Sequence, residues 1–336
     1  DDAAGGGLPP FEAVRPEHFE PAFAAAIDGH RGEIDAIAMQ PAAPTFENTI
    51  AAFDRSGAAL ERIGNLFHNL ASSETSPELQ AVQVRMAPVL AAHHSWTCTH
   101  RGLYARIDAL HARRDELPLT PEQRRVLERF HVDFVRAGAR LDAAGQQRSA
   151  QIMARLAELT TRFGQNVLAD EGAFQLVLRG ENDAAGLPEF VRAPLRQAAR
   201  DRGLDDGDPG AMVVTLARAH VVPFLTFSSR RDLREQAWGA WVGRGEHPGE
   251  HDNRDIAREI LALRRELARL HGHANFADYA LSDTMAGRRD AVLALLHQVW
   301  EPAKRRAAQE EAALRACPGA PARIEPWDWR FLAEQV

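Results

Sequence analysis

The sequence contains few cysteines and no long apolar or basic run. Cys98 and Cys317 are the only cysteines among its 336 residues, too few for a disulfide framework or a cysteine-based zinc site. We expect both to be structural or surface thiols. No stretch approaches the roughly 18 apolar residues that a membrane-spanning helix needs. Without a long basic run, nucleic acid is not expected as a partner, and neither is a membrane.

The chain also lacks a recognisable leader. It begins Asp1-Asp2-Ala3-Ala4 without a methionine, and it has neither the charged start nor the apolar run of a signal peptide. Either a leader has been removed or the numbering begins after a tag or another segment. We expect a cytoplasmic protein because cysteines are few, while a processed start of this kind keeps the periplasm open as the alternative.

The overall composition is that of an ordinary globular protein. Hydrophobic residues make up 45% of the chain and charged residues 26%, and the formal net charge is −7. A chain of 336 residues can bury a substantial core and corresponds to one large domain or two modest ones. No internal repeat and no low-complexity tract is visible in the sequence.

Helical periodicity dominates the first half of the sequence. Apolar residues recur three or four positions apart over residues 19–37, 46–70 and 152–163. Thr45 is placed to cap the second of these stripes. In Thr120-Pro121-Glu122-Gln123, a threonine cap, a proline at the first helical position and a glutamine at the third predict another helix start.

The helical pattern breaks near Glu171. Residues 174–178 and 212–216 are rich in valine and leucine and are typical of short strands, and the glycine- and aspartate-rich stretch 203–210 predicts a loop. A small hairpin-like sheet is therefore expected. Three further helix starts follow, near Ser229, Asp252 and Arg288.

These patterns predict a mainly α protein with a small β element near residues 173–216. We expect residues 1–170 to form an N-terminal helical domain, 171–217 a small β-containing insert or connection, and 218–336 a further helical segment. The stretch 180–210 is the best candidate for an internal boundary.

One local pattern matches a zinc-protease motif. His247-Pro248-Gly249-Glu250-His251 fits H-x-x-E-H, in which a helix places two histidines one turn apart with a glutamate beside the bound water. Pro248 and Gly249, however, favour a turn over a helix interior, and Asp252 resembles the cap of a new helix. We therefore expect an exposed loop here, with a catalytic zinc site as the less favoured alternative.

Other reactive residue types have structural explanations. His93 and His94 are adjacent and point to different sides of a helix, so they make a poor pair of ligands. His271 and His273 flank Gly272 at a helix end, where glycine and cationic side chains are both favoured. Structural roles are also expected for His100, for Ser228-Ser229 as a helix cap, and for Trp327-Asp328-Trp329 as packing residues rather than a ligand platform.

Motifs for other catalytic classes are missing from the sequence. It contains no G-x-S-x-G nucleophile motif, no Cys-His signature for thiol catalysis and no glycine-rich phosphate loop. Reading the residues alone therefore gives no assembled active site.

Several segments, in a shared order along nearly the whole chain, resemble the thimet-oligopeptidase-like zinc metallopeptidases. Residues 102–108 and 134–139 are similar to the bacterial peptidyl-dipeptidase (dipeptidyl carboxypeptidase) branch in particular. The other segments that carry the resemblance are 8–23, Thr45-Phe46-Glu47-Asn48-Thr49-Ile50, Asp252-Asn253-Arg254, 271–286 and 324–335.

The resemblance implies a mostly α-helical enzyme with two lobes around a deep channel. Zinc is held in such enzymes by the two histidines of a His-Glu-x-x-His helix and by a glutamate on a later helix. The motif glutamate acts as general base on the metal-bound water. Peptidyl-dipeptidases of this kind remove dipeptides from the free C-termini of short, unstructured peptides.

The zinc-binding motif does not occur in this sequence. No His-Glu-x-x-His is present in residues 1–336, so we assign no catalytic or metal-binding residue, and the substrate-binding residues are unknown. Zinc ligands are expected beyond Val336. The chain is expected to be the N-terminal portion of the enzyme, to form one wall of the substrate channel, and to be inactive alone.

Such a portion should expose apolar surface that the missing catalytic lobe would cover. Three alternatives stay open. One is an oligopeptidase A-like endopeptidase of the same family, another is a non-catalytic helical protein that binds peptides or a partner, and the third is a purely structural helical module.

Overall fold

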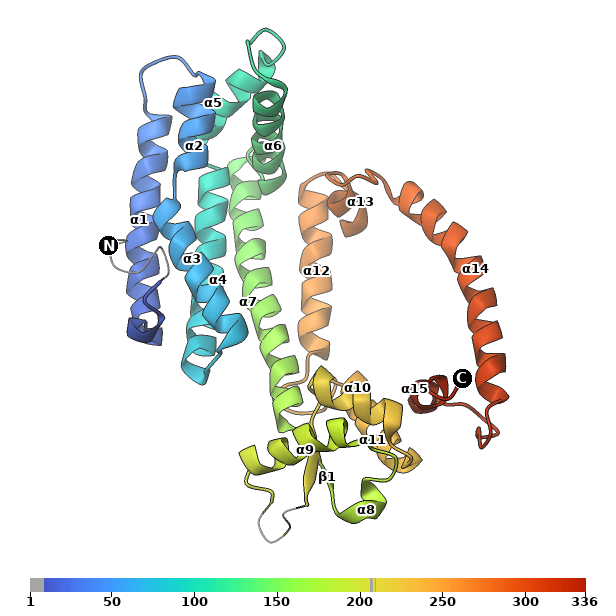
Figure 1. The fold of residues 1–336 in the computed structure, drawn as a ribbon. Coiled ribbons are helices and arrows are strands. Elements are labelled where there is room, and N and C mark those ends of the chain that lie inside the picture. Colours follow the sequence, from blue (N-terminus) through green and yellow to red (C-terminus); the bar gives the residue numbers. More distant parts are fainter. Residues whose placement is uncertain (1–8, 206–207, 209) are drawn as a thin grey trace. The chain divides into compact units, whose positions relative to one another are not determined.

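The computed structural model describes residues 9–205, 208 and 210–336 and is mainly α-helical, which confirms the predicted fold class (Figure 1). Residues 1–8 and residues 206, 207 and 209 of the expected loop lie outside the described residues. No helix in the described part of the chain is long and apolar enough to cross a membrane.

Internal contacts divide the chain into two compact units. Unit 1 runs to Arg162 and also contains Glu259–Ala280, whereas unit 2 contains Phe163–Arg258 and Leu281–Val336. The boundaries therefore fall at other positions than those of the three segments expected from the sequence. The division into an N-terminal domain, a β-containing connection and a later helical segment stays a prediction.

Unit 1 is a set of packed helices. Helix α1 contacts α3, α4 and α5, and α6 contacts α4 and α5. The elements are η1 (Phe11–Ala13), η2 (Pro16–His18), α1 (Phe19–Ala38), η3 (Phe46–Ala51), α2 (Ala52–Arg55), α3 (Ala58–Ser73), α4 (Pro77–Cys98), α5 (Arg101–Ala112), α6 (Pro121–Ala137), the first part of α7 (Ala143–Ala173), the later part of α12 (Arg254–Leu270) and α13 (Phe276–Leu281).

The expected apolar stripe of α1 is buried in unit 1. Phe23 and Ile34 are fully buried. Phe19 and Phe23 pack edge-on against Phe67 of α3, with ring centroids 4.9 and 5.5 Å away. The predicted helix over residues 19–37 is thus confirmed, and its apolar face forms part of the core.

The predicted cap at Thr120 is also confirmed. The Thr120 hydroxyl accepts a hydrogen bond from the Gln123 backbone N–H at 3.2 Å, and the Gln123 side chain accepts one from the Thr120 N–H at 3.0 Å. Helix α6 then ends at Gly138, which adopts φ +108°, a conformation that glycine tolerates best.

The stripe over residues 46–70 is not one continuous helix. Thr45 caps it as expected, accepting from the Asn48 N–H at 3.1 Å. However, Ser56 is extended and Gly57 adopts φ +74°, so the chain breaks between α2 and α3. Apolar periodicity continued through the break, because both helices present their apolar side chains to the same unit.

Unit 2 combines helices with a two-stranded sheet. Its core includes Leu178, Leu195, Val214, Val221 and Phe224. The elements are the end of α7, β1 (Leu176–Leu178), α8 (Gly180–Asp183), α9 (Glu189–Asp201), β2 (Met212–Val214), α10 (Arg218–Phe227), α11 (Arg231–Val242), the start of α12, α14 (Arg289–Arg315) and α15 (Pro326–Ala333).

The predicted sheet is confirmed, although its connection is not a simple hairpin loop. Strands β1 and β2 pair antiparallel, with Leu176 opposite Val214 and Leu178 opposite Met212. Helices α8 and α9 lie between them in the sequence, and α9 packs against β2. The amphipathic α9 thereby buries Val191 and Leu195, which covers the short sheet with apolar side chains.

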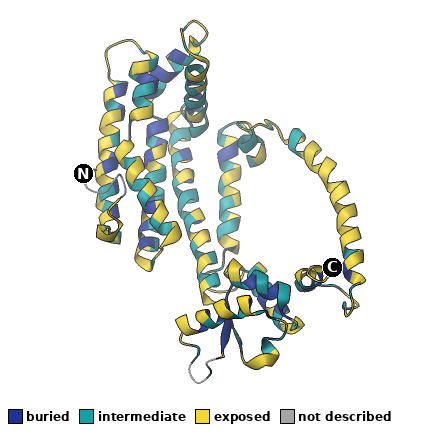
Figure 2. Ribbon diagram, in the orientation of Figure 1, coloured by how far each residue is buried: buried dark blue, intermediate teal, exposed yellow. Residues whose placement is uncertain are grey.

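Helix α14 is exposed along almost its entire length (Figure 2). Of its 27 residues, only Leu314 is buried. Leu295, Leu296, Val299 and Trp300 are 56–61% exposed. An apolar surface of this kind on one helix is typical of a face that another segment or molecule covers.

Candidate functional site

A cavity lined by four tryptophans lies within unit 2, and we call it the tryptophan cavity. Its volume is about 530 Å³, within the range of small-molecule and peptide sites. It lies between α10, α11 and α15. The lining residues are Leu225, Thr226, Trp238, Trp241, Pro326, Trp327, Trp329, Arg330, Ala333 and Glu334.

A charge cluster around the buried Asp328 fixes one wall of this cavity. Asp328 of α15 is fully buried, and it accepts hydrogen bonds from Arg231 at 2.8 and 2.9 Å and from Arg234 at 2.9 Å. Arg234 also donates to the Trp327 carbonyl at 3.0 Å. The two arginines are three residues apart on α11, which places them on the same helix face. Helix α15 is thereby tied to α11.

Electrostatics keep Asp328 ionised despite its burial. Burial alone would raise the pKa of this carboxyl, but hydrogen bonds from Arg231, the Glu325 backbone N–H and Arg234 lower the pKa below its usual value. Burial lowers the pKa of Arg234, which Asp328 opposes. Because an arginine stays charged at neutral pH, the cluster carries two positive charges for one negative charge.

Trp327 and Trp329 differ in their packing and exposure. Trp327 packs against Trp238 with ring centroids 5.7 Å apart, and the Arg231 guanidinium lies 5.7 Å from the Trp327 ring centre. The expectation of packing is therefore correct for Trp327. Trp329 is 37% exposed and lines the cavity. Within the described part of the chain, the buried Trp327 Nε1–H has no hydrogen-bond partner.

This arrangement is suited to binding rather than to bond cleavage. Aromatic walls pack against apolar groups, and the exposed Arg330 and Glu334 add one charge of each sign. Glu334 and Thr226 are the only lining residues of a type that can act as a base or a nucleophile, and the Thr226 hydroxyl donates to the Val222 carbonyl of its own helix at 2.9 Å. The cavity can therefore hold a ligand with apolar side chains and a carbonyl or carboxylate oxygen.

Comparison with known proteins places these residues in a peptidase family. Residues 224–336, which include all ten cavity-lining residues, match the model of Peptidase family M3. Dipeptidyl carboxypeptidase of Escherichia coli is 32% identical over 331 residues, which cover 98% of this chain and 48% of that protein. This chain is a homologue of the family M3 peptidases.

Oligopeptidase A of Haemophilus influenzae is similar to nearly the same degree, with 31% identity over 336 residues, 98% of this chain and 48% of that protein. A probable cytosolic oligopeptidase A of Arabidopsis thaliana is 24% identical over 301 residues, covering 88% of this chain and 43% of that protein. The chain spans about half the length of the curated relatives it matches. The resemblance to the N-terminal half of M3 peptidases is confirmed.

Two of the segments that resemble family M3 meet at one buried arginine in unit 1. Arg106 donates to Asn48 Oδ1 at 2.9 Å and to Thr49 Oγ1 at 3.2 Å. It also donates to the Gln40 and Ala42 carbonyls at 3.1 and 3.0 Å. The Glu-Asn-Thr signature is thus part of a structural clamp that holds η3 against α5.

A third such segment also has a structural role. Asn253 is buried at the start of α12, where its side chain donates to the Phe163 carbonyl at 3.0 Å and accepts from Asn166 at 2.9 Å. Asp252 caps the helix by accepting from the Arg254 N–H at 2.9 Å. Hydrogen bonds from Arg254 lower the pKa of Asp252 to about 2.

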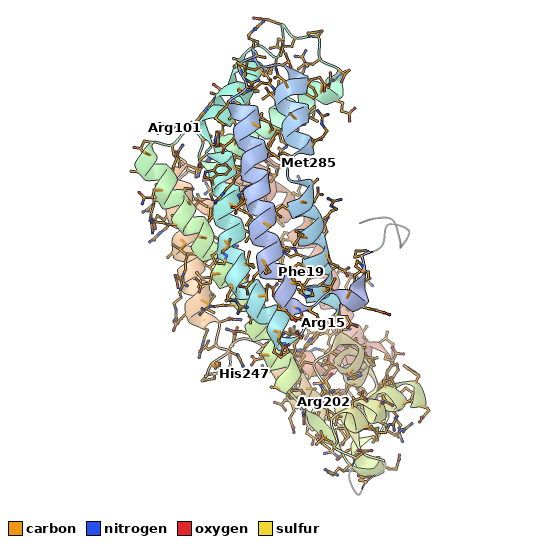
Figure 3. The ribbon with its side chains drawn as sticks, turned by 90° about the vertical axis from the view of Figure 1, so that its left-hand side faces the viewer. Arg15, Phe19, Arg101, Arg202, His247 and Met285 are labelled. Carbon is orange, nitrogen blue, oxygen red and sulfur yellow. The ribbon has the colours of Figure 1, made fainter. Side chains whose placement is uncertain are left out.

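The H-x-x-E-H pattern is not a metal motif in this fold. His247–His251 form bends and turns and not a helix, and both His247, which Figure 3 labels, and Glu250 are exposed. The predicted loop is confirmed. Among residues 9–205, 208 and 210–336, no group of three or more histidine, cysteine, aspartate or glutamate side chains comes together in a way that could hold a metal ion. The described residues therefore do not fit the zinc of the family.

The histidines near residue 93 lie in different environments, as expected. His93 is buried, and its Nε2 lies 2.9 Å from His30 Nδ1, while His94 is exposed. His100 caps α5 by accepting from the Leu103 N–H at 3.2 Å, and its other ring nitrogen lies 3.1 Å from Asp35. The structural roles predicted for these residues are confirmed.

The helix end at Gly272 follows the prediction only in part. Gly272 adopts φ +78°, as the last turn of α12 requires. However, burial lowers the pKa of His271, with smaller contributions from His273 and Arg136. This shift disfavours the protonated form of His271, which the expected interaction of a cationic side chain with the helix end requires.

The remaining reactive groups are structural. The buried Ser228 Oγ accepts from the Arg230 N–H at 3.2 Å. The N-cap of α11 is Arg230, which makes no side-chain cap hydrogen bond, so the predicted cap at Ser228-Ser229 is wrong, and Ser228 instead orders the turn before the helix. Cys98 is buried, and burial followed by the charge of Asp133 raises the pKa of its thiol to about 12. Cys317 is half-buried.

Sequence reasoning missed the cluster of Asp328, Arg231 and Arg234. A signal was present, because an aspartate between two tryptophans on an amphipathic helix must either face solvent or find a buried cation. The partners lie almost 100 residues earlier in the chain, so spacing along the sequence could not identify them.

Proposed function

We propose that this chain is the N-terminal portion of a zinc-dependent peptidyl-dipeptidase that removes dipeptides from the C-terminus of short peptides. The observation that carries the proposal is 32% identity to dipeptidyl carboxypeptidase along 98% of this chain. In the complete enzyme, the zinc ligands lie in sequence beyond Val336, and the present part forms one wall of the substrate channel. The partners are short unstructured peptides and the catalytic lobe, in the cytoplasm or alternatively the periplasm.

The exposed face of α14 supports a partner lobe. Leu295, Leu296, Val299 and Trp300 are more than half exposed, and burying them against further protein would remove a large apolar area from water. The catalytic lobe is the occupant we propose, because the relatives are about twice as long as this chain.

The tryptophan cavity is the part of this chain that we propose for contact with the peptide. Its aromatic walls suit apolar side chains, and the exposed Arg330 suits a backbone carbonyl or a terminal carboxylate. No step of bond cleavage is assigned to these residues.

Product analysis of the complete protein tests the proposal. The protein encoded by the full reading frame should contain about one zinc ion per chain and should release C-terminal dipeptides from an N-terminally blocked hexapeptide, as seen by mass spectrometry. Cleavage at internal bonds only would instead support an oligopeptidase A-like endopeptidase, which the 31% identity to oligopeptidase A favours as second candidate. A zinc-free protein that binds peptides without cleaving them would overturn both.

A cavity variant tests the peptide contact separately. In the complete enzyme, Trp329→Ala should raise KM about tenfold and leave kcat within about twofold, because truncating a large aromatic contact typically removes more than 1 kcal/mol of binding free energy. Met285→Ala is the matched control, since Met285 is fully exposed and does not line the cavity. Unchanged KM for Trp329→Ala would remove the tryptophan cavity from the substrate path without touching the enzyme assignment.

A further inference from the structure

Unit 1 contains two neighbouring cavities, which we call the arginine cavity, after Arg136, and the phenylalanine cavity, after Phe53 and Phe130. Their volumes are about 330 and 320 Å³. The exposed side chains of His94 on α4 and Asp133 on α6 line both cavities, so the two adjoin at these residues. All residues that line either cavity belong to unit 1.

The phenylalanine cavity presents apolar side chains that a ligand can reach. Phe53, Leu60, Leu90 and Phe130 line it, and each of the four is half-buried and keeps part of its surface accessible. The rings of Phe53 and Phe130 pack edge to face with centroids 5.0 Å apart. The volume is roughly twice that of an engineered cavity of about 150 Å³ that holds benzene, so the cavity can accept an aromatic or large aliphatic group.

Asp133 provides a carboxylate where the two cavities adjoin. Its side chain is 48% exposed, and Oδ1 accepts a hydrogen bond from Arg129 at 3.0 Å. Exposed ion pairs contribute little energy, and a carboxylate can accept several hydrogen bonds at once. Asp133 can therefore bind a ligand ammonium group alongside Arg129.

The charge of Asp133 also acts within the phenylalanine cavity. Burial, followed by this charge, raises the pKa of the Cys98 thiol to about 12, and Cys98 lines that cavity. A positively charged ligand group is favoured there for the same electrostatic reason.

Arg136 provides a fixed positive charge in the arginine cavity. Its Nη1 donates to the Tyr279 carbonyl at 2.9 Å, and its guanidinium carbon lies 4.6 Å from the centre of the Tyr279 ring. The Tyr279 hydroxyl donates to the Arg136 carbonyl at 3.0 Å. A guanidinium has five N–H donors in a planar fork that matches a carboxylate. Because these contacts already hold Arg136, binding a carboxylate costs little side-chain freedom.

The spacing of the two charges fits a dipeptide. Asp133 and Arg136 lie three positions apart on α6, which places their Cβ atoms about 5–6 Å apart on one helix face. Two residues of extended chain span at most about 7 Å, whereas one residue spans about 3.5 Å. The free ends of a dipeptide can therefore reach both charges, and those of a single amino acid are too close together.

We propose that unit 1 binds dipeptides that have free ends and an apolar N-terminal side chain. The ammonium group binds Asp133, the carboxylate binds Arg136, and the first side chain enters the phenylalanine cavity, which begins at Asp133. Dipeptides are also what the proposed peptidase would release. The inference nevertheless rests on the two cavities and not on that function.

Titration of the 336-residue chain with phenylalanylalanine tests the proposal. NMR spectra of ¹⁵N-labelled protein should show saturable shifts of backbone resonances in α6. Acetylating the ammonium group or amidating the carboxylate should each weaken binding about tenfold, the effect of losing one charge-assisted hydrogen bond. Alanylalanine, which lacks the ring, should also bind about tenfold more weakly.

Asp133→Asn is the matched variant, because asparagine has the shape of aspartate without its charge. It should weaken binding of phenylalanylalanine about tenfold and abolish the difference between this dipeptide and its acetylated form. A merely structural role of Asp133 would leave that difference unchanged. Asp54→Asn is the control, since Asp54 is exposed in the same unit and lines neither cavity.

Two results would overturn the proposal. One is the absence of saturable phenylalanylalanine binding by folded protein. The other is an acetylated or amidated form that binds as tightly as the free dipeptide, which would mean that one of the two charges does not recognise a peptide end. Both results concern binding without cleavage, so they are distinct from a failure of the proposed peptidase activity.

Discussion

Helices α1 and α14 are both long and both carry apolar side chains, but the chain buries only one of them. Helix α1 has 20 residues and buries six of them, whereas α14 has 27 residues and buries one. Helix α1 finds its partners, α3, α4 and α5, within unit 1. The comparison shows that an amphipathic helix needs another segment to cover its apolar face. The tertiary structure determines whether the same chain provides that segment.

The largest expected effects are in the buried helix. Phe23→Ala in α1 should lower the free energy of unfolding by about 3–5 kcal/mol, because it leaves a cavity where a fully buried ring was. Trp300→Ala in α14 is the matched aromatic control and should change it by less than about 0.5 kcal/mol, since Trp300 is 61% exposed. Urea unfolding of the chain measures both, and equal losses would contradict the comparison.

Breaking the charge cluster around the buried Asp328 should have an effect of similar size in unit 2. Asp328→Ala leaves Arg234 buried without its counter-ion, which typically costs about 3–5 kcal/mol. Asp232→Ala is the control, because Asp232 pairs with Arg230 at the surface, where such pairs contribute little. A stability of Asp328→Ala equal to that of the control would mean that α15 is not held by this cluster.

Acid should destabilise unit 1 through His93. Its pKa is lowered to about 4 in the folded state from 6.5, so the unfolded chain binds the proton first. The stabilisation is fully present above about pH 6.5 and is lost as pH falls toward 4, with a limiting slope of about 1.4 kcal/mol per pH unit for one proton. Urea titrations at several pH values measure this slope, and His93→Phe should flatten it. An unchanged slope in this variant would assign the pH dependence to other groups.

Substitutions on the exposed face of α14 should change the free energy of unfolding least, but they should clearly weaken self-association. Replacing Leu296 and Trp300 with lysine should leave the unfolding free energy nearly unchanged, while the self-association of the chain should weaken at least tenfold as the apolar face is lost. The two added positive charges reduce the net charge of −7, so weaker association cannot come from charge repulsion. Sedimentation equilibrium measures the change, and a wild-type chain that is monomeric throughout would contradict the exposed-face interpretation.

Much of the fold was readable from local pattern. The Thr120 capping box, the α1 stripe and the two short strands all depend on neighbours within a few residues, and each was found where the pattern predicts it. The break at Gly57 was missed because apolar spacing continued across it. Local spacing reports which face of a segment is apolar, but it does not report whether the backbone between two segments is straight.

The candidate sites depended on distant residues and were not readable in the same way. The sequence drew attention to His247 and His251, which lie in turns, whereas the tryptophan cavity assembles side chains from three helices. Asp328 and Arg234 are 94 positions apart. Nothing in the local pattern of either residue encodes the other, because the ion pair exists only once α11 and α15 are packed.

The sequence by itself determined the helical class, several helix starts and the relation to M3 peptidases, because these follow from short-range hydrogen bonding, apolar periodicity and the order of motifs. Only the tertiary structure decided which polar groups are buried, with or without partners. Burial removes water as an alternative hydrogen-bond partner, and which groups lose water depends on contacts between segments far apart in the chain. The paired Asp328 and the unpartnered His93 Nδ1 are the two outcomes of that loss in this protein.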